Sequence, residues 1–582
     1  MLDFHDVLAT RLGGTRDTAG LLLIMGGGLV TLLPNLPYWA WAGGGLALSL
    51  AGGALIGLHF ASCIRIKRFG GACGLELNSD AVPPADENGM SIGFVGDTAQ
   101  ELVIPPAEWT RHAMIVGQSG VGKTVLGQWL MLQQIERGGG LLWIDGKLDP
   151  ANLEDLHRAC AWCGREGDLL VINPGNPALS NTYNPLLDGE PDEIAARCGA
   201  LLPEAEANAG ADYYRQGAIN AIATLVDAIQ AAGYGFHFAD LQTLLTSANA
   251  LEALASALDA RASGRGDARM RFSLFIDQYR RVDRVTRKHE IDTNELKRVF
   301  GGLGARLSQF GSGGFGRVMN TYSPEVNLFD AVTHNKIVYV MLPTMGKGEA
   351  ASALGRLVIG DFRTAIARVQ ALPESERPNP PFLGFFDEAG SYLTQAWSRM
   401  FEQARSARLV MVPAFQTRAN LAALGDELVA QVAGNTLTKI FFKPGEPETA
   451  KWMADMIGQE MQEQRSQSSN ETISARNASL ADHMRGAGGT LGGSGDGAGE
   501  SRSARLGYRV TPDDLARLGK GEAVALYDGA KVYKLHIPRV TFDDDFVERA
   551  GSFKLSHPAA AAGAPGLDIA RMLPSASEQE DE

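Results

Sequence analysis

The chain has 582 residues, of which 45% are hydrophobic and 21% are charged, and this balance is ordinary for a globular protein. The length corresponds to roughly three to four domains. The formal net charge of −14 excludes a protein that binds nucleic acid over its whole surface, so any contact with a polyanion has to be local.

The N-terminal region is apolar enough to enter a membrane. Residues 19–64 contain no Asp, Glu, Lys or Arg, and Pro34 and Pro37 divide them into two runs that can each supply a crossing of about 20 residues. Basic residues lie on both outer flanks, which favours a cytoplasmic location for both ends. They are Arg11, Arg16, Arg65, Lys67 and Arg68. We therefore predict that residues 1–68 form an anchor of two transmembrane helices. The alternative is a cleaved signal peptide, and the basic stop after the second run disfavours it.

A phosphate-binding pattern, G-x-x-x-x-G-K-[ST], is complete at residues 117–124. The matching residues are Gly117, Gln118, Ser119, Gly120, Val121, Gly122, Lys123 and Thr124. A short apolar run precedes the pattern and a helical spacing of apolar residues follows it. The glycines let backbone N–H groups surround a phosphate, and the helix N-terminus adds the positive end of its dipole. We predict that this loop binds ATP, with Lys123 reaching the β- and γ-phosphates and Thr124 holding Mg²⁺.

Apolar runs recur along the chain, with helical patterns between them. They cover residues 113–116, 141–144, 169–172, 337–342, 382–386, 409–413 and 437–442. Strands that alternate with helices predict an α/β fold, with a mostly parallel sheet and helices on both faces. We assign this nucleotide-binding domain to residues 69–187 and 323–545.

Strand signals are missing between residues 185 and 322, a stretch too long for a loop. Its helical patterns predict an inserted all-α domain at 188–322. Within it, residues 261–288 contain nine basic residues against three acidic ones, and they include Phe272, Phe275 and Tyr279. The arginines suit a phosphate backbone or a solvated helical face equally well, whereas we expect the aromatic side chains to be buried.

The C-terminal part changes composition twice. Residues 462–505 are rich in Gln, Ser, Asn and Gly, which predicts a flexible loop. A hairpin follows at 522–527 and 531–537, around Asp528-Gly529. We predict that residues 546–582 form a disordered tail with an acidic end.

Two acids follow the apolar run at 382–386. Parallel strands end at the same edge of a sheet, so Asp387 and Glu388 should emerge beside the phosphate loop. We predict that Asp387 holds Mg²⁺ through water and that Glu388 polarises the attacking water.

Two further residues lie where a hydrolysis sensor is expected. Gln416 follows the run at 409–413 and either bonds the γ-phosphate or caps a loop. Arg405 can reach the nucleotide of a neighbouring subunit as an arginine finger. Arg408 is the rival for this role, and a surface ion pair is the alternative for either arginine.

The motifs occur together in an order that resembles the TraD/TraG-type coupling proteins of conjugation and type IV secretion. After the anchor and the phosphate loop they are Ile144-Asp145-Gly146-Lys147, Tyr183-Asn184-Pro185-Leu186, Phe385-Phe386-Asp387-Glu388, Gln403-Ala404-Arg405-Ser406 and Gly434-Asn435. The resemblance implies a RecA-like P-loop ATPase domain related to the FtsK translocases, and a homo-hexamer in the bacterial inner membrane with its ATPase domain in the cytoplasm. It also implies that single-stranded DNA bound by a relaxase, within a relaxosome, is taken to the components of a secretion channel, and that protein substrates are carried in some members.

The sequence departs from the family pattern at Gly146, because the family often has Asp-Pro-Lys-Gly at this turn.

Besides a coupling ATPase, two other functions stay open. One is an FtsK-like translocase of double-stranded DNA, and the other is a membrane recruiter that uses the nucleotide as a switch without pumping.

Overall fold

The computed structural model describes residues 46–47, 49–51, 53–54, 79–96, 98–202, 209–260, 266–282, 289–394, 397–423, 425–470, 497–558 and 563–569. Most of the predicted anchor therefore lies outside the described residues. Within them, no helix combines the length and the apolar character that a membrane crossing requires.

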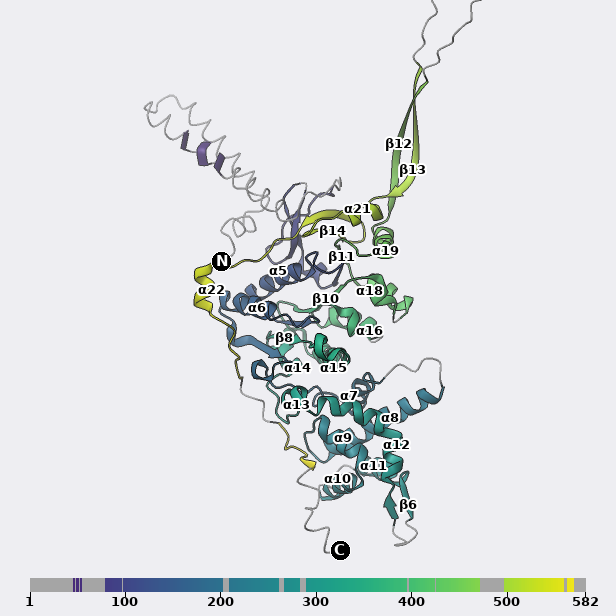
Figure 1. Ribbon diagram of the computed structural model, residues 1–582. Coiled ribbons are helices and arrows are strands. Elements are labelled where there is room, and N and C mark those ends of the chain that lie inside the picture. Colours follow the sequence, from purple (N-terminus) through teal and green to yellow (C-terminus); the bar gives the residue numbers. More distant parts are fainter. Residues whose placement is uncertain are drawn as a thin grey trace, which may run out of the picture.

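An 11-stranded sheet forms the centre of the molecule, in the order β2-β1-β15-β14-β11-β3-β10-β9-β4-β8-β5 (Figure 1). The pairs from β11 to β5 are all parallel, whereas β14, β15, β1 and β2 extend the sheet in antiparallel pairs. The seven predicted strands and the predicted hairpin are thus confirmed. The bounds are β1 Met90–Val95, β2 Glu101–Ile104, β3 Ala113–Val116, β4 Leu141–Asp145, β5 Leu169–Ile172, β8 Ile337–Met341, β9 Phe382–Phe386, β10 Leu409–Phe415, β11 Thr438–Phe441, β14 Glu522–Tyr527 and β15 Lys531–His536.

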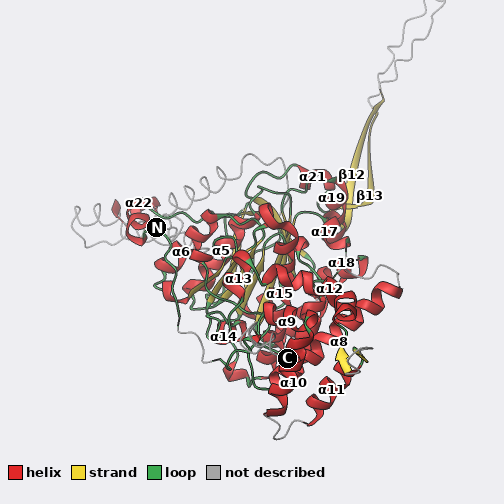
Figure 2. Cartoon of the chain, turned by 60° about the horizontal axis from the view of Figure 1, so that its bottom comes forward, coloured by secondary structure: helices red, strands yellow, loops and turns green. Residues whose placement is uncertain are grey.

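Helices cover both faces of this sheet (Figure 2), which explains why its strands are almost wholly apolar. Successive side chains of a strand point to opposite faces, so Ala113 and Ile115 of β3 join one buried cluster and Met114 and Val116 join another. The helices outside the insert are α4 Pro106–Trp109, α5 Lys123–Glu136, α6 Pro150–Trp162, α14 Leu328–Thr333, α15 Thr344–Ala371, α16 Trp397–Ser406, α17 Arg418–Ala422, α18 Asp426–Asn435, α19 Pro447–Ile457, α21 Pro512–Ala516 and α22 Asp544–Ala550. Short 3₁₀ turns lie at Glu166–Asp168, Pro177–Leu179, Glu374–Glu376 and Ala389–Ser391.

In the region predicted as an all-α insert, the regular elements of the described residues are helices, apart from one small hairpin. Most of its helices gather at one end of the molecule (Figure 1). They are α7 Pro191–Gly199, α8 Ala209–Ala231, α9 Phe238–Thr246, α10 Ala248–Ala260, α11 Gly266–Asp277, α12 Thr293–Phe310 and α13 Gly313–Met319. The hairpin pairs β6, Arg280–Val282, with β7, His289–Ile291. It could not be read from the sequence because β6 is short and fully exposed.

The described arginines of the basic segment lie in ion pairs. Arg269 pairs with Asp259, Arg271 with Asp227, Arg280 with Asp277 and Arg281 with Asp292. Local acids therefore offset this part of the positive charge, which favours the solvated-face interpretation for these four side chains. Phe272 and Phe275 are buried, as predicted, whereas Tyr279 is only half-buried. Residues 261–265 and 283–288 lie outside the described residues.

The predicted flexible loop at 462–505 is partly wrong. Strand β12, Gln459–Asn470, pairs with β13, Gly497–Tyr508, in an antiparallel ribbon that projects from the body (Figure 1). Backbone pairing needs no apolar side chains, so a polar composition did not reveal it. Residues 471–496 lie outside the described residues.

The predicted disordered tail is wrong for 546–558 and 563–569. After α22 the chain runs down the side of the molecule to the insert (Figure 1), and we call residues 551–558 with 563–569 the C-terminal strap. Phe553, Leu567 and Ile569 in it are buried, and Leu567 N donates to Gly235 O at 2.8 Å. These partners are remote in sequence, so local composition could not predict the order. The acidic end, 570–582, lies outside the described residues.

Candidate nucleotide-binding site

The phosphate loop connects the end of β3 to the first turn of α5. Gly120 and Gly122 have φ angles of 78° and 123°, in the left-handed region that favours glycine. Gly117 is required for a different reason. A Cβ atom there would lie 2.5 Å from Cβ of Phe442, so only glycine lets the loop pack against the end of β11.

Lys123 lies in the centre of the loop and is 3% exposed. Its Nζ donates to Gly117 O at 2.6 Å and to Gln118 O at 2.8 Å. Burial lowers the pKa of Lys123 to about 8, although the carboxylate of Asp387 opposes the shift. The ammonium therefore faces the inner side of the loop, where the pattern predicts the phosphates to bind.

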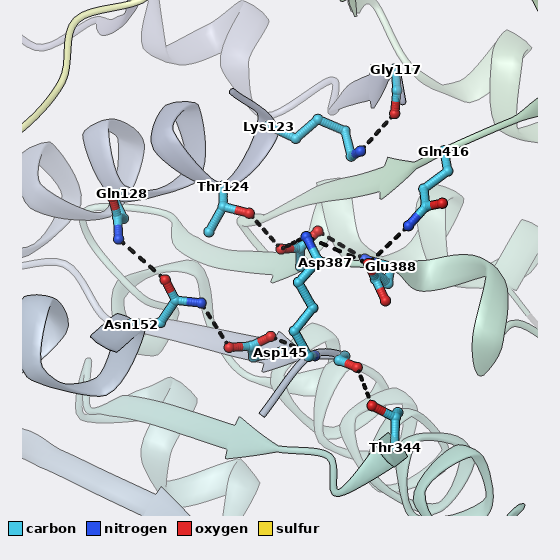
Figure 3. Close-up of polar contacts among 12 residues, drawn as sticks. Gly117, Lys123, Thr124, Gln128, Asp145, Asn152, Thr344, Asp387, Glu388 and Gln416 are labelled. Carbon is cyan, nitrogen blue, oxygen red and sulfur yellow. Dashed lines mark hydrogen bonds and ion pairs between the residues drawn. The ribbon is translucent and has the colours of Figure 1, made fainter. Parts of the chain in front are cut away.

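Thr124 and Asp387 meet as predicted. Oγ1 of Thr124 donates to Oδ2 of Asp387 at 2.9 Å (Figure 3), and Asp387 is fully buried at the end of β9. Strand β10 separates β9 from β3 in the sheet, so the acid reaches the loop across one intervening strand.

Glu388 lies beside Asp387 in a left-handed backbone conformation, with a φ of 51°. Its Oε1 accepts from Nε2 of Gln416 at 2.8 Å (Figure 3). The predicted water activator and the predicted sensor are thus in direct contact. The contact of Gln416 with a phosphate stays a prediction.

Lys147 also belongs to this group, although the sequence analysis gave it no role. Its Nζ lies 3.5 Å from Oε1 of Glu388 and 3.8 Å from Oδ2 of Asp387. Burial disfavours its charge, but the two carboxylates outweigh burial and raise the pKa of Lys147. The signal that could have found it is its position directly after β4, which neighbours β9 in the sheet.

A buried network holds the start of the turn that carries Lys147. Asp145 accepts from the Tyr339 hydroxyl at 2.6 Å, from Nδ2 of Asn152 at 2.9 Å and from the backbone N–H of Lys147 at 2.8 Å. Burial raises the pKa of Asp145. Its three donors indicate a structural role.

The two candidate arginines differ in their surroundings. Arg405 is exposed on α16, and among the described residues no hydrogen bond or ion pair to its guanidinium is found. Arg408 instead donates through Nη2 to Oδ1 of Asn379 at 2.9 Å. Of the two guanidinium groups, that of Arg405 is therefore the one not bonded to another described residue of the chain.

The residues fit a magnesium nucleotide. The side of Gly120 faces open space, since an added Cβ would have no neighbour within 4 Å. The Thr124 hydroxyl and the Asp387 carboxylate present a pair of oxygen donors, the ligand type that Mg²⁺ prefers. Lys123 supplies a buried positive charge next to them.

Comparisons with known proteins agree with this geometry. Residues 381–518 match the family model described as the TraM recognition site of TraD and TraG. The chain is 24% identical over 413 residues to the type 4 coupling protein DotL of Legionella pneumophila, with 62% of this chain and 51% of that protein covered. It thus spans about half the length of this curated relative.

The solved structures that resemble the chain show the same fold. One is the bacterial conjugative coupling protein TrwBdeltaN70 in its unbound form, with a TM-score of 0.52, 14% identity, and coverage of 78% of this chain and 90% of that chain. Another is TrwB in complex with ADP and Mg²⁺, with a TM-score of 0.51, 14% identity, and coverage of 79% and 91%. The predicted α/β fold with a mostly parallel sheet is confirmed. Together with the family match and the curated relative, this fold shows that the chain is similar to the TraD/TraG-type coupling proteins.

Proposed function

We propose that the chain is an ATP hydrolase of the P-loop class that uses ATP and Mg²⁺. The observation that carries this proposal is the hydrogen bond between Thr124 and Asp387. It brings two predicted Mg²⁺ ligands together beside the buried Lys123. The similarity to TrwB, which has been solved with ADP and Mg²⁺, supports the choice of ligands.

Each residue has a separate task in this proposal. The loop N–H groups and Lys123 would bind the phosphates, and Thr124 and Asp387 would hold Mg²⁺. When bound there, Mg²⁺ would supply charge neutralisation at the phosphate oxygens. Glu388 accepts a proton from the attacking water, and Gln416 fixes the side chain of Glu388 through the 2.8 Å hydrogen bond. This pair favours hydrolysis over a purely switching role.

For the whole protein we propose a homo-hexamer anchored in the bacterial inner membrane. It would recruit single-stranded DNA bound by a relaxase, and also protein substrates, and drive them to a type IV secretion channel. The apolar segment at 19–64 supports the anchor. The exposed Arg405 supports a ring in which one subunit completes the site of the next. The similarity to DotL and TrwB supports the role in secretion.

The test is ATP hydrolysis by the full chain, purified in detergent. We expect hydrolysis that depends on Mg²⁺ and is stimulated by single-stranded DNA. We expect Glu388→Gln to lower the rate by at least about a hundredfold while ADP binding is retained. Glu376→Gln, which changes an exposed acid, is the matched control and should leave the rate unchanged.

Three outcomes would change the proposal. ATP hydrolysis by the Glu388→Gln variant at the wild-type rate would contradict the role assigned to Glu388. Stronger stimulation by double-stranded DNA would favour an FtsK-like translocase. Nucleotide binding without any hydrolysis would favour a switch.

A further inference from the structure

The turn after β4 contacts both the candidate catalytic acid and the start of α15, the helix whose side chains pair with those of the insert. We propose that Lys147 is a positioning residue for the Glu388 carboxylate. We also propose that a displacement of the inserted helical region is transmitted through the turn of Lys147 and changes the orientation of that carboxylate. This inference rests on the proposed ATPase function.

The first step concerns the side chain of Glu388. Oε1 of Glu388 has two cationic or polar neighbours, Nε2 of Gln416 at 2.8 Å and Nζ of Lys147 at 3.5 Å. They come from β10 and β4 regions on the two sides of β9. A carboxylate held from both sides keeps one orientation, and catalysis by a general base is sensitive to displacements of about 1 Å.

The second step concerns the backbone beneath Glu388. A Cβ atom on Gly146 would lie 2.9 Å from Cβ of Glu388 and 3.3 Å from the Asp387 carbonyl oxygen. The turn therefore lies directly against the backbone of both acids. The buried Asp145 fixes the start of the turn through Tyr339 and Asn152. Movement of the turn would consequently displace Glu388.

The third step connects the turn to α15. The Thr344 hydroxyl, in the first turn of α15, donates to Gly146 O at 2.8 Å (Figure 3). Just before it, Leu342 N donates to Asp145 O at 3.0 Å. Thr344 and the segment just before α15 are thus bonded to the carbonyl oxygens of Gly146 and Asp145.

The fourth step connects α15 to the insert. Arg197 of α7 forms a buried ion pair with Asp361 of α15 at 3.1 Å and donates to the Thr364 hydroxyl at 2.9 Å. Near the start of α15, Glu349 accepts from Arg306 of α12 at 2.6 Å. Lys347 breaks the helical geometry of α15, with φ −145° and ψ 53°, so a kink separates Thr344 from Glu349, Asp361 and Thr364. A ligand or partner that shifts the insert would move the longer part of α15 and would reach Thr344 through this kink.

The first experiment measures ATP hydrolysis by the full chain carrying Lys147→Ala or Lys147→Arg. We expect Lys147→Ala to lower kcat about tenfold with KM for MgATP changed less than about twofold, and Lys147→Arg to recover most of the rate. Lys336→Ala is the matched control, because Lys336 also forms an ion pair, with Asp168 at 2.6 Å, but it precedes β8 at the N-terminal ends of the parallel strands, whereas Lys147 follows the C-terminal end of β4. An unchanged kcat in Lys147→Ala would overturn the proposal. So would a large rise in KM with kcat unchanged, because it would place the effect on nucleotide binding.

The second experiment does not depend on activity. Thermal unfolding without nucleotide is compared for Lys147→Ala, Glu388→Gln and the double variant. We expect Lys147→Ala to lower the midpoint by about 2 °C in the wild-type background and by less in the Glu388→Gln background, because the charged partner is gone. Equal shifts in both backgrounds would overturn the Lys147–Glu388 contact.

The third experiment tests the connection to α15. We expect Thr344→Val to lower kcat severalfold, Thr344→Ser to restore it, and the combination with Lys147→Ala to be no worse than Lys147→Ala alone. Losses of kcat that multiply in the double variant would overturn the connection.

If the wild-type chain hydrolyses no ATP, the proposed function fails, while the unfolding experiment still tests the contact between Lys147 and Glu388. If the wild type hydrolyses ATP and the Lys147 and Thr344 variants hydrolyse it at the same rate, this inference fails while the proposed function stands.

Discussion

Thr124 and Asp387 lie 263 positions apart in the chain, and a hydrogen bond of 2.9 Å joins their side chains. The pattern alone predicts a role for Thr124 in Mg²⁺ binding, and the position of Asp387 supplies a second oxygen donor at the same point. The bond shows that the sheet places the two sequence motifs at one point.

Removal of the Thr124 hydroxyl should weaken nucleotide binding only when Mg²⁺ is present. We expect Thr124→Ala to raise the Kd for a fluorescent ADP about tenfold with Mg²⁺, which is roughly 1.4 kcal/mol, and to leave the Kd in EDTA unchanged. Thr124→Ser keeps the hydroxyl and is the control. An equal loss in EDTA would mean that the residue shapes the loop instead of holding the metal.

The two candidate arginines should behave differently. We expect Arg405→Ala to lower kcat about a thousandfold with little change in ADP affinity, and Arg408→Ala to have a much smaller effect, because Arg408 is bonded to Asn379 within its own chain. Mixing Arg405→Ala subunits with Glu388→Gln subunits should restore part of the activity, since some interfaces then pair an intact arginine with an intact glutamate. No recovery in the mixture would contradict an arginine that acts between subunits.

Glu101 of β2 should make stability depend on pH. Burial raises its pKa from 4.5 to about 7, although Ser91 and Arg137 oppose the shift. Between these two pH values the folded chain holds a proton that the unfolded chain has lost, so stability falls as pH rises through this range and the loss is complete above about pH 7.

Glu101→Gln removes this titration. We expect the variant to unfold at a higher temperature than the wild type at pH 8, with a gain of up to roughly 3 kcal/mol, and the advantage to disappear as the pH falls toward 4.5. Glu87→Gln, which changes an exposed acid in the same region, should show no such pH dependence. A constant difference at every pH would rule out the titration of Glu101 as the cause.

The C-terminal strap should contribute to stability. We expect removal of residues 551–582 to lower the thermal midpoint, because Phe553, Leu567 and Ile569 are buried and each such side chain contributes about 1.5–3 kcal/mol. Removal of residues 570–582 is the matched control and should have little effect. Identical midpoints for the two truncated chains would contradict a stabilising strap.

The sheet could be predicted because its strands are buried on both faces and stand out as apolar runs. The acids at the end of β9 could be predicted for a related reason. Parallel strands end at one edge, so a complete phosphate loop indicates where Asp387 and Glu388 should lie.

Other features depend on partners that are distant in sequence. Lys147 became visible as a neighbour of Glu388 only once the strand order placed β4 next to β9. The strap contains few apolar residues, and their partners, such as Gly235 and Tyr322, lie far away in the chain. Composition alone describes such a segment as disordered, since it carries no information on what the segment packs against.

The buried cluster on one face of the sheet has a consequence for modularity. Met114 and Val116 of β3 belong to the same continuous cluster as Phe238 and Phe310 of the insert. The core of the insert is therefore continuous with the core on this face of the sheet. A graft of the insert into a related protein would have to carry matching side chains where the two cores meet.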